Sequence, residues 1–169
     1  MHMPGIDADV LGRLYRQHAP ALRLYARQWP GGGDDFVQEA FVRLACQKSL
    51  PDQVLPWLYR VVRNLALAAG RSANRRRRRE ARASAPEAWF SVADDRIDAD
   101  DAARLLGGLA LEWREVIVAR VWGGLTFEEI AQLVGCSLPT AHRRYQAGLA
   151  ELGERLSGQW TRTLRLPAT

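Results

Sequence analysis

The stretch Thr126–Leu149, TFEEIAQLVGCSLPTAHRRYQAGL, combines the clearest helix-capping and turn signals of the chain. Thr126 can cap a helix with its hydroxyl, and Glu129, three residues later, can reach back to the backbone N–H of that cap. Gly135 can adopt the left-handed conformation that ends a helix, and Ser137 can cap the helix that follows. The pattern therefore predicts a helix-turn-helix.

The second helix of this motif carries polar side chains that suit DNA. Pro139 lies in its first turn, where a missing N–H costs nothing. Side chains on such a helix can meet phosphates or base edges in a major groove, and the candidates are Ser137, Thr140, His142, Arg143 and Arg144. The alternative is an ordinary helical hairpin with a solvated basic face. Because the caps, the turn and the polar face agree, double-stranded DNA is the favoured partner.

Apolar residues recur at helical spacing along most of the remaining chain. This spacing predicts one or two helices from about residue 7 to 29, with Pro20 able to kink or break them. It predicts a helix to about residue 47, capped by Asp34 or Asp35, and a long helix from about Leu55 past Arg71. Further helices are expected around 105–109 and 113–121. No segment alternates like a strand for more than a few residues, so the predicted fold is all-α.

The composition fits a folded chain of one domain or two small ones, with 169 residues and 47% hydrophobic content. No apolar run reaches about eighteen residues and no signal peptide is recognisable, so we expect a cytoplasmic location without membrane insertion. The net charge is +5, and all 24 basic residues except Lys48 are arginines, which suit phosphates and guanine edges. Cys46 and Cys136 lie far apart and belong to no metal-binding motif, so no metal site, cofactor or disulfide is expected.

Charge and periodicity divide the chain into two helical domains with a flexible linker between them. The expected ranges are 8–80 for the first domain, 81–97 for the linker and 98–156 for the second domain. Five consecutive arginines, Arg75–Arg79, precede the linker. Trp89 and Phe90 are unusual in a linker, and we expect them either to dock on one of the domains or to meet a partner, with docking slightly favoured.

Two regions of the chain resemble group-four sigma factors, which are the sigma factors of the extracytoplasmic-function type. Residues 35–41 (DFVQEAF) and 57–66 (WLYRVVRNLA) are similar to the family's second region. Residues 125–131 (LTFEEIA), with Gly135–Ser137 and Thr140, are similar to its fourth region. The resemblance covers roughly residues 8 to 155. It implies a bacterial initiation factor that binds RNA polymerase core and directs it to a subset of promoters, with loosely tethered domains unless an inhibitor clamps them.

The same resemblance implies roles for individual residues. Asp35, Gln38 and Glu39 match the helix of the family that contacts the polymerase clamp. The alternative for these three residues is a plain solvated helix face. The flap of the polymerase is a further expected contact of the chain. Asn64 matches the position that grips a base flipped out of the minus-ten element, and an Asn offers both a donor and an acceptor to a base edge. The other residues implied at the minus-ten element, as phosphate contacts, are Arg60, Arg63, Arg71, Arg75 and Arg76. The helix-turn-helix would read the minus-thirty-five element, where His142 departs from the commonest pattern. An anti-sigma factor is a further partner implied by the family.

Other interpretations of these residues remain open. Trp57 is expected in the core, whereas Tyr59 could be either core or a stacking platform. A stand-alone helix-turn-helix regulator is the first rival, although it would have no use for the segments around Gln38 and Asn64. A metal-dependent nuclease is the second rival, with carboxylates at Asp94, Asp95, Asp98, Asp100 and Asp101. Since no accompanying catalytic motif is present, no enzymatic activity is expected.

Overall fold

The computed structural model describes residues 6–80 and 104–163, and every regular element within these ranges is a helix. The predicted all-α class is confirmed. The expected linker, with Trp89, Phe90 and the five aspartates of the nuclease alternative, lies outside the described residues. None of the described helices combines the length and the apolar character needed to cross a membrane.

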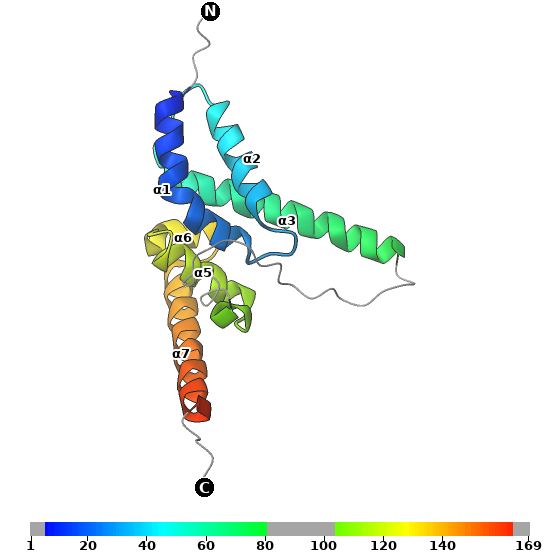
Figure 1. Cartoon of the computed structure of the whole chain (residues 1–169), viewed down its shortest axis with the longest axis vertical. Helices are drawn as coiled ribbons and strands as arrows, with labels where there is room; N and C mark the ends of the chain where they lie inside the picture. Colours follow the sequence, from blue (N-terminus) through cyan, green and yellow to red (C-terminus); the bar gives the residue numbers. More distant parts are fainter. Residues whose placement is uncertain (1–5, 81–103, 164–169) are drawn as a thin grey trace, which may run out of the picture.

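Three helices form the first half of the molecule: α1 (Ala8–Ala26), α2 (Asp34–Ala45) and α3 (Val54–Glu80). α1 and α2 lie side by side, and α3 crosses them and extends beyond them (Figure 1). α1 is a single helix that continues through Pro20. The expectation that Asp34 or Asp35 caps α2 was wrong, because Gly33 is the N-cap and makes no side-chain cap. Asp34 instead lies in the first turn, where its carboxylate pairs with Arg23 at 2.9 Å.

The second half contains a helical turn at 104–107 followed by α5 (Leu111–Val121), α6 (Phe127–Val134) and α7 (Leu138–Thr163). The predicted capping box is present: Glu129 N donates to Thr126 Oγ1 at 3.2 Å, and Thr126 N donates to Glu129 Oε2 at 2.8 Å. Gly135 ends α6 in the left-handed conformation with φ of 71°. α6 and α7 therefore form the predicted helix-turn-helix, and α7 continues beyond Leu156.

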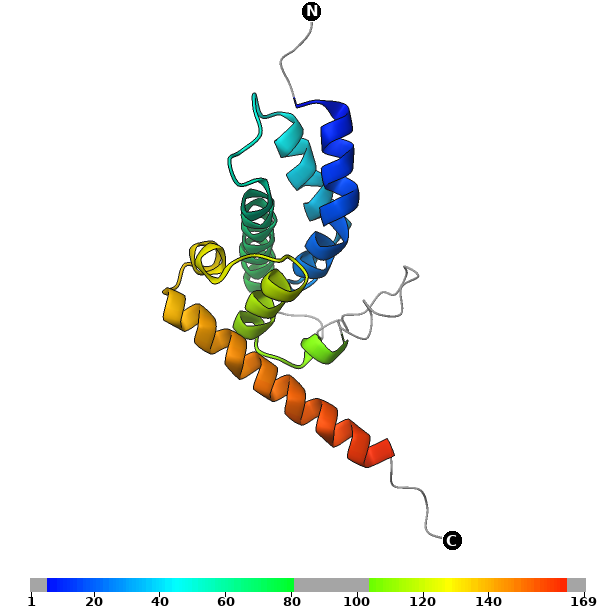
Figure 2. The ribbon, with the colours of Figure 1, turned by 90° about the vertical axis from the view of Figure 1, so that its left-hand side faces the viewer.

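The two halves share one continuous hydrophobic core. Its largest fully buried side chains come from both halves and include Leu22, Tyr25, Leu58, Tyr59, Val116, Ile117, Leu125 and Ile130. α1 packs against α5 and α3 packs against α6, so that α5 lies between the first half and α7 (Figure 2). This docking differs from the loose tethering expected from the resemblance. Tyr59, whose role the sequence left open, is a core residue, and the partly buried Trp57 packs against the same core.

Candidate nucleic-acid interface

Polar side chains form a stripe along the exposed side of α3. Arg60, Asn64, Arg71 and Arg75 are all exposed. At about 100° per residue, these positions fall within an arc of about 60° on the helix surface. Their spacing along α3 therefore places three guanidinium groups and one amide on a single face, where they can follow a nucleic-acid strand. This face is separate from the buried face that carries Leu58, Val62 and Ala66.

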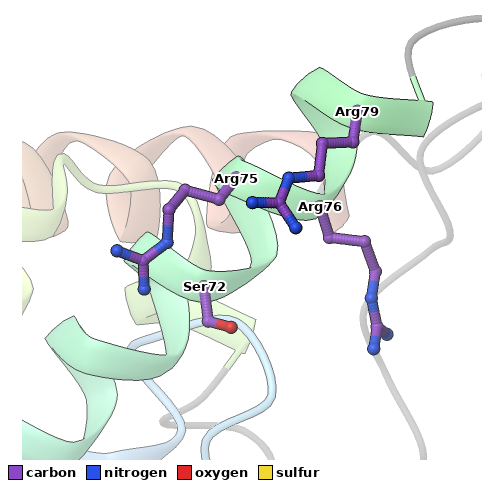
Figure 3. Close-up of a pocket in the computed structure, with 4 residues that line it drawn as sticks. All are labelled: Ser72, Arg75, Arg76 and Arg79. Atoms are coloured by element: carbon purple, nitrogen blue, oxygen red, sulfur yellow. The ribbon is translucent and has the colours of Figure 1, made fainter.

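The far end of α3 presents a shallow basic depression. It is lined by Ser72, Arg75, Arg76 and Arg79, and the Arg75 and Arg76 guanidinium groups point to either side of Ser72 (Figure 3). A hydroxyl between cationic donors is suited to an anionic oxygen such as that of a phosphate. Because this end of α3 extends beyond α1 and α2 (Figure 1), the depression lies at the edge of the molecule. It thus continues the stripe that begins at Arg60.

Arg63 differs from the other predicted minus-ten residues, because its guanidinium is already paired with a carboxylate. Its Nε donates a hydrogen bond to Glu115 Oε1, and the same oxygen accepts from Tyr25 Oη at 2.7 Å. Glu115 is only 5% exposed. Burial lowers the pKa of Arg63, but the hydrogen bond and the charge of Glu115 outweigh burial and raise that pKa overall. We call Tyr25, Arg63 and Glu115 the Glu115 junction.

The start of α7 organises its polar side chains through local hydrogen bonds. Ser137 Oγ accepts from the backbone N–H of Thr140 at 3.3 Å, which makes Ser137 the predicted cap. The hydroxyls of Ser137 and Thr140 are 2.9 Å apart, and Arg143 Nη2 donates to Thr140 Oγ1 at 3.4 Å. Arg143 is exposed. This network holds hydroxyl and guanidinium groups together at the helix start, the part of a recognition helix that enters a major groove.

His142 and Arg144 are placed differently from Arg143. The His142 ring stacks on Phe127 of α6, with ring centroids 3.8 Å apart and planes tilted by 31°. Its helical position lies about 100° from Arg143, toward α6. Arg144 pairs with the Glu112 carboxylate of α5 at 3.1 Å. The structure therefore leaves Thr140 and Arg143 as the centre of this face, with His142 at its edge and Arg144 tied to α5.

A third polar face lies on α2. Asp35 and Gln38 are exposed and Glu39 is half-buried, where its carboxylate pairs with Arg43 at 2.7 Å. Val42, 56% exposed, falls on the same side of the helix between these residues. The opposite side carries the buried Val37, Ala40, Phe41 and Leu44. This side of α2 therefore presents acidic and amide groups around one exposed apolar side chain.

Glu112, Glu115 and Val42 were not identified from the sequence as functional candidates. One sequence signal could have pointed to Glu115. It precedes the apolar run Val116–Ala119, and all five of these residues are buried. A charge within a helix segment that is buried on every side needs a partner. The pattern does not say which residue that partner is, because Tyr25 and Arg63 belong to other helices.

Comparison with known proteins matches both halves separately. Residues 14–77 match the family model described as Sigma-70 region 2, and residues 100–152 match the model described as Sigma-70, region 4. The chain belongs to the sigma-70 family. Within it, the sigma factor is of the extracytoplasmic-function type. The first region contains α2 and most of α3, and the second contains the helix-turn-helix.

One curated relative and two solved structures are similar to the sigma factor over most of its length. ECF RNA polymerase sigma factor SigE of Mycolicibacterium smegmatis is 31% identical over 160 residues, which cover 85% of this chain and 60% of that protein. The sigma factor thus spans about three-fifths of that relative. RpoE of Bartonella quintana, solved with the anti-sigma factor NepR, superposes with a TM-score of 0.71 at 22% identity, covering 89% of this chain and 98% of that one. CnrH, solved with the cytosolic domain of CnrY, superposes with a TM-score of 0.61 at 25% identity, covering 90% and 91%.

Proposed function

We propose that this sigma factor binds the core of bacterial RNA polymerase and directs initiation at particular promoters. Two separate polar surfaces, one on α3 and one at the start of α7, give the chain two places to contact one DNA molecule. The α3 stripe is the observation that carries the proposal, because a regulator that reads DNA only through its helix-turn-helix has no use for it. The polymerase would carry out the chemistry of RNA synthesis. This chain would select the promoter and help to open its strands.

The α3 stripe would read and open the minus-ten element. Asn64 is exposed between Arg60 and Arg71, so a flipped base could reach its amide while the arginines hold phosphates on either side. Unstacking a base costs a few kcal/mol, and cationic contacts along the separated strand would offset that cost. The basic depression at Ser72 and Arg75 would extend these contacts farther along the strand.

The start of α7 would read the minus-thirty-five element in a major groove. Thr140 and Arg143 are the best-placed residues for base edges, because their side chains are exposed or half-buried and joined by a hydrogen bond. Ser137 would contribute a hydroxyl at the helix N-terminus, where phosphates bind favourably. His142, stacked on Phe127, would contact DNA only at the edge of this face.

The α2 face would dock on the polymerase clamp through Asp35, Gln38 and Glu39, with Val42 supplying the apolar centre of the contact. The helix-turn-helix domain would contact the flap region. An anti-sigma factor is a further partner in this proposal, since RpoE of Bartonella quintana was solved with the anti-sigma factor NepR and CnrH was solved with the cytosolic domain of CnrY. The site of action would be the cytoplasm, where the polymerase and its promoters are.

Run-off transcription with purified bacterial core polymerase and a library of genomic fragments tests the proposal. We expect specific transcripts only when the sigma factor is added, and a stable complex with core in gel filtration. The double variant Gln38→Ala, Val42→Ala should weaken core binding, while Arg13→Ala on the exposed surface of α1 serves as the matched control. A chain that binds promoter duplex alone and never associates with core would instead be the stand-alone regulator.

A further inference from the structure

The two helices of the helix-turn-helix are joined by a stack of rings. Phe127, the first residue of α6, contacts the Arg120 guanidinium of α5 and the His142 ring of α7. The ring centroids of Phe127 and His142 are 3.8 Å apart with planes tilted by 31°, and the Arg120 guanidinium carbon lies 4.9 Å from the Phe127 centroid. Tyr145, three positions after His142, adds an edge contact to Phe127 at 5.3 Å. We call these four residues the Phe127 stack.

The position of the Phe127 ring is set by contacts that do not involve α7. Arg120 Nη1 donates to the backbone carbonyl oxygen of Leu125 at 2.8 Å, and Leu125 is buried. The capping box of Thr126 and Glu129 then holds the first turn of α6, where Phe127 lies. Arg120 therefore ties the ring to α5 both through its own cation–π contact and through the loop that leads into α6. The ring is thus a firm surface for a side chain of α7.

Two side chains of α7 that flank Arg143 are held by different helices. His142 stacks on Phe127 of α6, and Arg144 pairs with Glu112 of α5 at 3.1 Å. At about 100° per residue, His142 and Arg144 lie on either side of Arg143 around the helix axis. Contacts on both sides oppose rotation of α7 about that axis, so the exposed Arg143 is presented in one direction.

The two contacts differ in how they respond to DNA. The Glu112 side chain is 53% exposed, so a phosphate can compete with its carboxylate for Arg144. A phosphate cannot replace Phe127 in the same way, because the stack with His142 depends on ring contact as well as on charge. The stack is therefore the contact that keeps its geometry when α7 meets a phosphate backbone.

We propose that His142 is a positioning residue: its stack on Phe127 fixes the rotation of α7 and so determines which base edge of the minus-thirty-five element Arg143 reaches. This inference rests on the proposed function, which assigns Arg143 to base edges. Recognition groups must be held to within about 10–20°, and arginine reads guanine through two parallel hydrogen bonds to O6 and N7. A rotated α7 would lose that paired geometry but keep phosphate contacts. The expected signature is a loss of sequence preference with little loss of nonspecific binding.

Proton NMR of the free chain at constant pH tests the stack itself. The chain has three histidines, and the ring signals that disappear in His142→Phe are those of His142. A ring stacked 3.8 Å from the Phe127 centroid lies in the shielding region of that aromatic ring, so we expect its protons to be shifted upfield. Phe127→Leu keeps an apolar side chain, should remove this shift and should leave the His18 signals unchanged. His142 signals that do not move in Phe127→Leu would overturn the stack.

Promoter selection by the holoenzyme tests the consequence for DNA. Core polymerase with each sigma variant is equilibrated with promoters randomised at the minus-thirty-five element, and the bound sequences are determined. His142→Phe retains a ring for stacking but has no ring nitrogen for a base edge, whereas His142→Ala lacks both. We expect His142→Phe to keep the wild-type preference within about twofold, and His142→Ala to reduce it roughly threefold to tenfold, the range of one aromatic pair. Gln132→Ala, at an exposed position of α6, is the control and should change nothing.

Phe127→Leu separates positioning from direct contact with a base. Phe127 has no assigned DNA contact, so we expect Phe127→Leu to lose as much preference as His142→Ala, and the double variant to lose no more. Equal losses in His142→Phe and His142→Ala, or a normal preference in Phe127→Leu, would overturn the proposal. Circular dichroism establishes that each variant keeps its helix content; should Phe127→Leu lose helix, Phe127→Tyr keeps the ring and must retain the preference. A wild-type holoenzyme without minus-thirty-five preference would overturn the proposed function, and the NMR shift would then still report the stack.

Discussion

Tyr25 donates a 2.7 Å hydrogen bond to the carboxylate of Glu115, which lies ninety positions later in the sequence. This bond joins α1 of the first half to α5 of the helix-turn-helix half. The carboxylate has a second donor in Arg63. The two halves of this sigma factor are therefore linked by specific chemistry as well as by apolar packing.

Replacing Tyr25 by Phe removes that bond and leaves the ring in place. Since hydrogen bonds to charged groups contribute about 1.5–3 kcal/mol, we expect a loss of that order in the free energy of unfolding, measured with guanidinium chloride. Tyr145→Phe is the matched control, because the ring of Tyr145 contacts Phe127 while no hydrogen bond of its hydroxyl is found among the described residues. Equal stability of the two variants would show that the hydrogen bond from Tyr25 to Glu115 contributes nothing.

Alkaline pH should destabilise the protein through two buried tyrosines. Burial raises the pKa of Tyr59, and burial followed by the charge and hydrogen bond of Glu115 raises the pKa of Tyr25. The unfolded chain ionises these phenols near pH 10 while the folded chain keeps them protonated, so their stabilising contribution is complete below about pH 10 and declines above it. Tyrosinate absorbance should rise in a late step that coincides with unfolding. Tyr25→Phe and Tyr59→Phe should each reduce that step, and a titration in which both phenols ionise without unfolding would contradict the prediction.

Two glycines of α7 should respond oppositely to substitution by alanine. A Cβ on Gly148 would lie 2.5 Å from Ile117 Cδ1 and 3.1 Å from Trp113 Cβ, whereas one on Gly153 meets nothing within 4 Å. Gly148→Ala should therefore cost about 1–3 kcal/mol by overpacking the contact with α5. Gly153→Ala should stabilise by about 0.5–1 kcal/mol through helix propensity. Thermal unfolding of both variants measures the difference, and the same sign for both would mean that α7 does not pack on α5 as described.

Asn64→Ala should impair promoter opening without weakening core binding. The exposed amide is lost, while the α2 face and the buried face of α3 are untouched. Permanganate reactivity of unpaired thymines measures opening, and gel filtration with core measures binding. Gln47→Ala, which removes an exposed amide that follows α2, is the control and should leave opening unchanged. If Asn64→Ala lost core binding but opened promoters normally, the role proposed for the α3 stripe would be wrong.

Arg143→Ala should weaken recognition of the minus-thirty-five element more than Arg144→Ala does. Arg143 is exposed and hydrogen-bonded to Thr140, whereas Arg144 is already paired with Glu112. A lost base contact costs about 1–3 kcal/mol and relaxes sequence preference, while a lost phosphate contact reduces affinity for all sequences and lowers the salt slope by about 0.9. Binding of holoenzyme to wild-type and altered elements at several salt concentrations separates these effects. A larger loss for Arg144→Ala would show that the Glu112 pair opens on DNA.

The sequence alone determined the parts of this protein that depend on neighbouring residues. The capping box of Thr126 and Glu129, the left-handed Gly135 and the Ser137 cap are local hydrogen bonds and dihedral angles, so they can be read from spacing within a few residues. The exposed α3 stripe also follows from helical periodicity. Local signals were insufficient at α2, where Gly33 caps the helix and Asp34 pairs with Arg23 instead.

How the two halves meet depends on contacts between residues that are distant along the chain. The apolar run after Glu115 indicates that this residue needs a partner, but the sequence does not name the partner. Glu112 has no such signal, and Arg63 is one arginine among many. Their pairing depends on helices that are close in space but distant along the chain. It also depends on Gly123, because a side chain at this position would collide with Tyr59. Periodicity reports which face of a helix is buried, but the identity of its partner is a property of the packed core, where shape and charge are satisfied together.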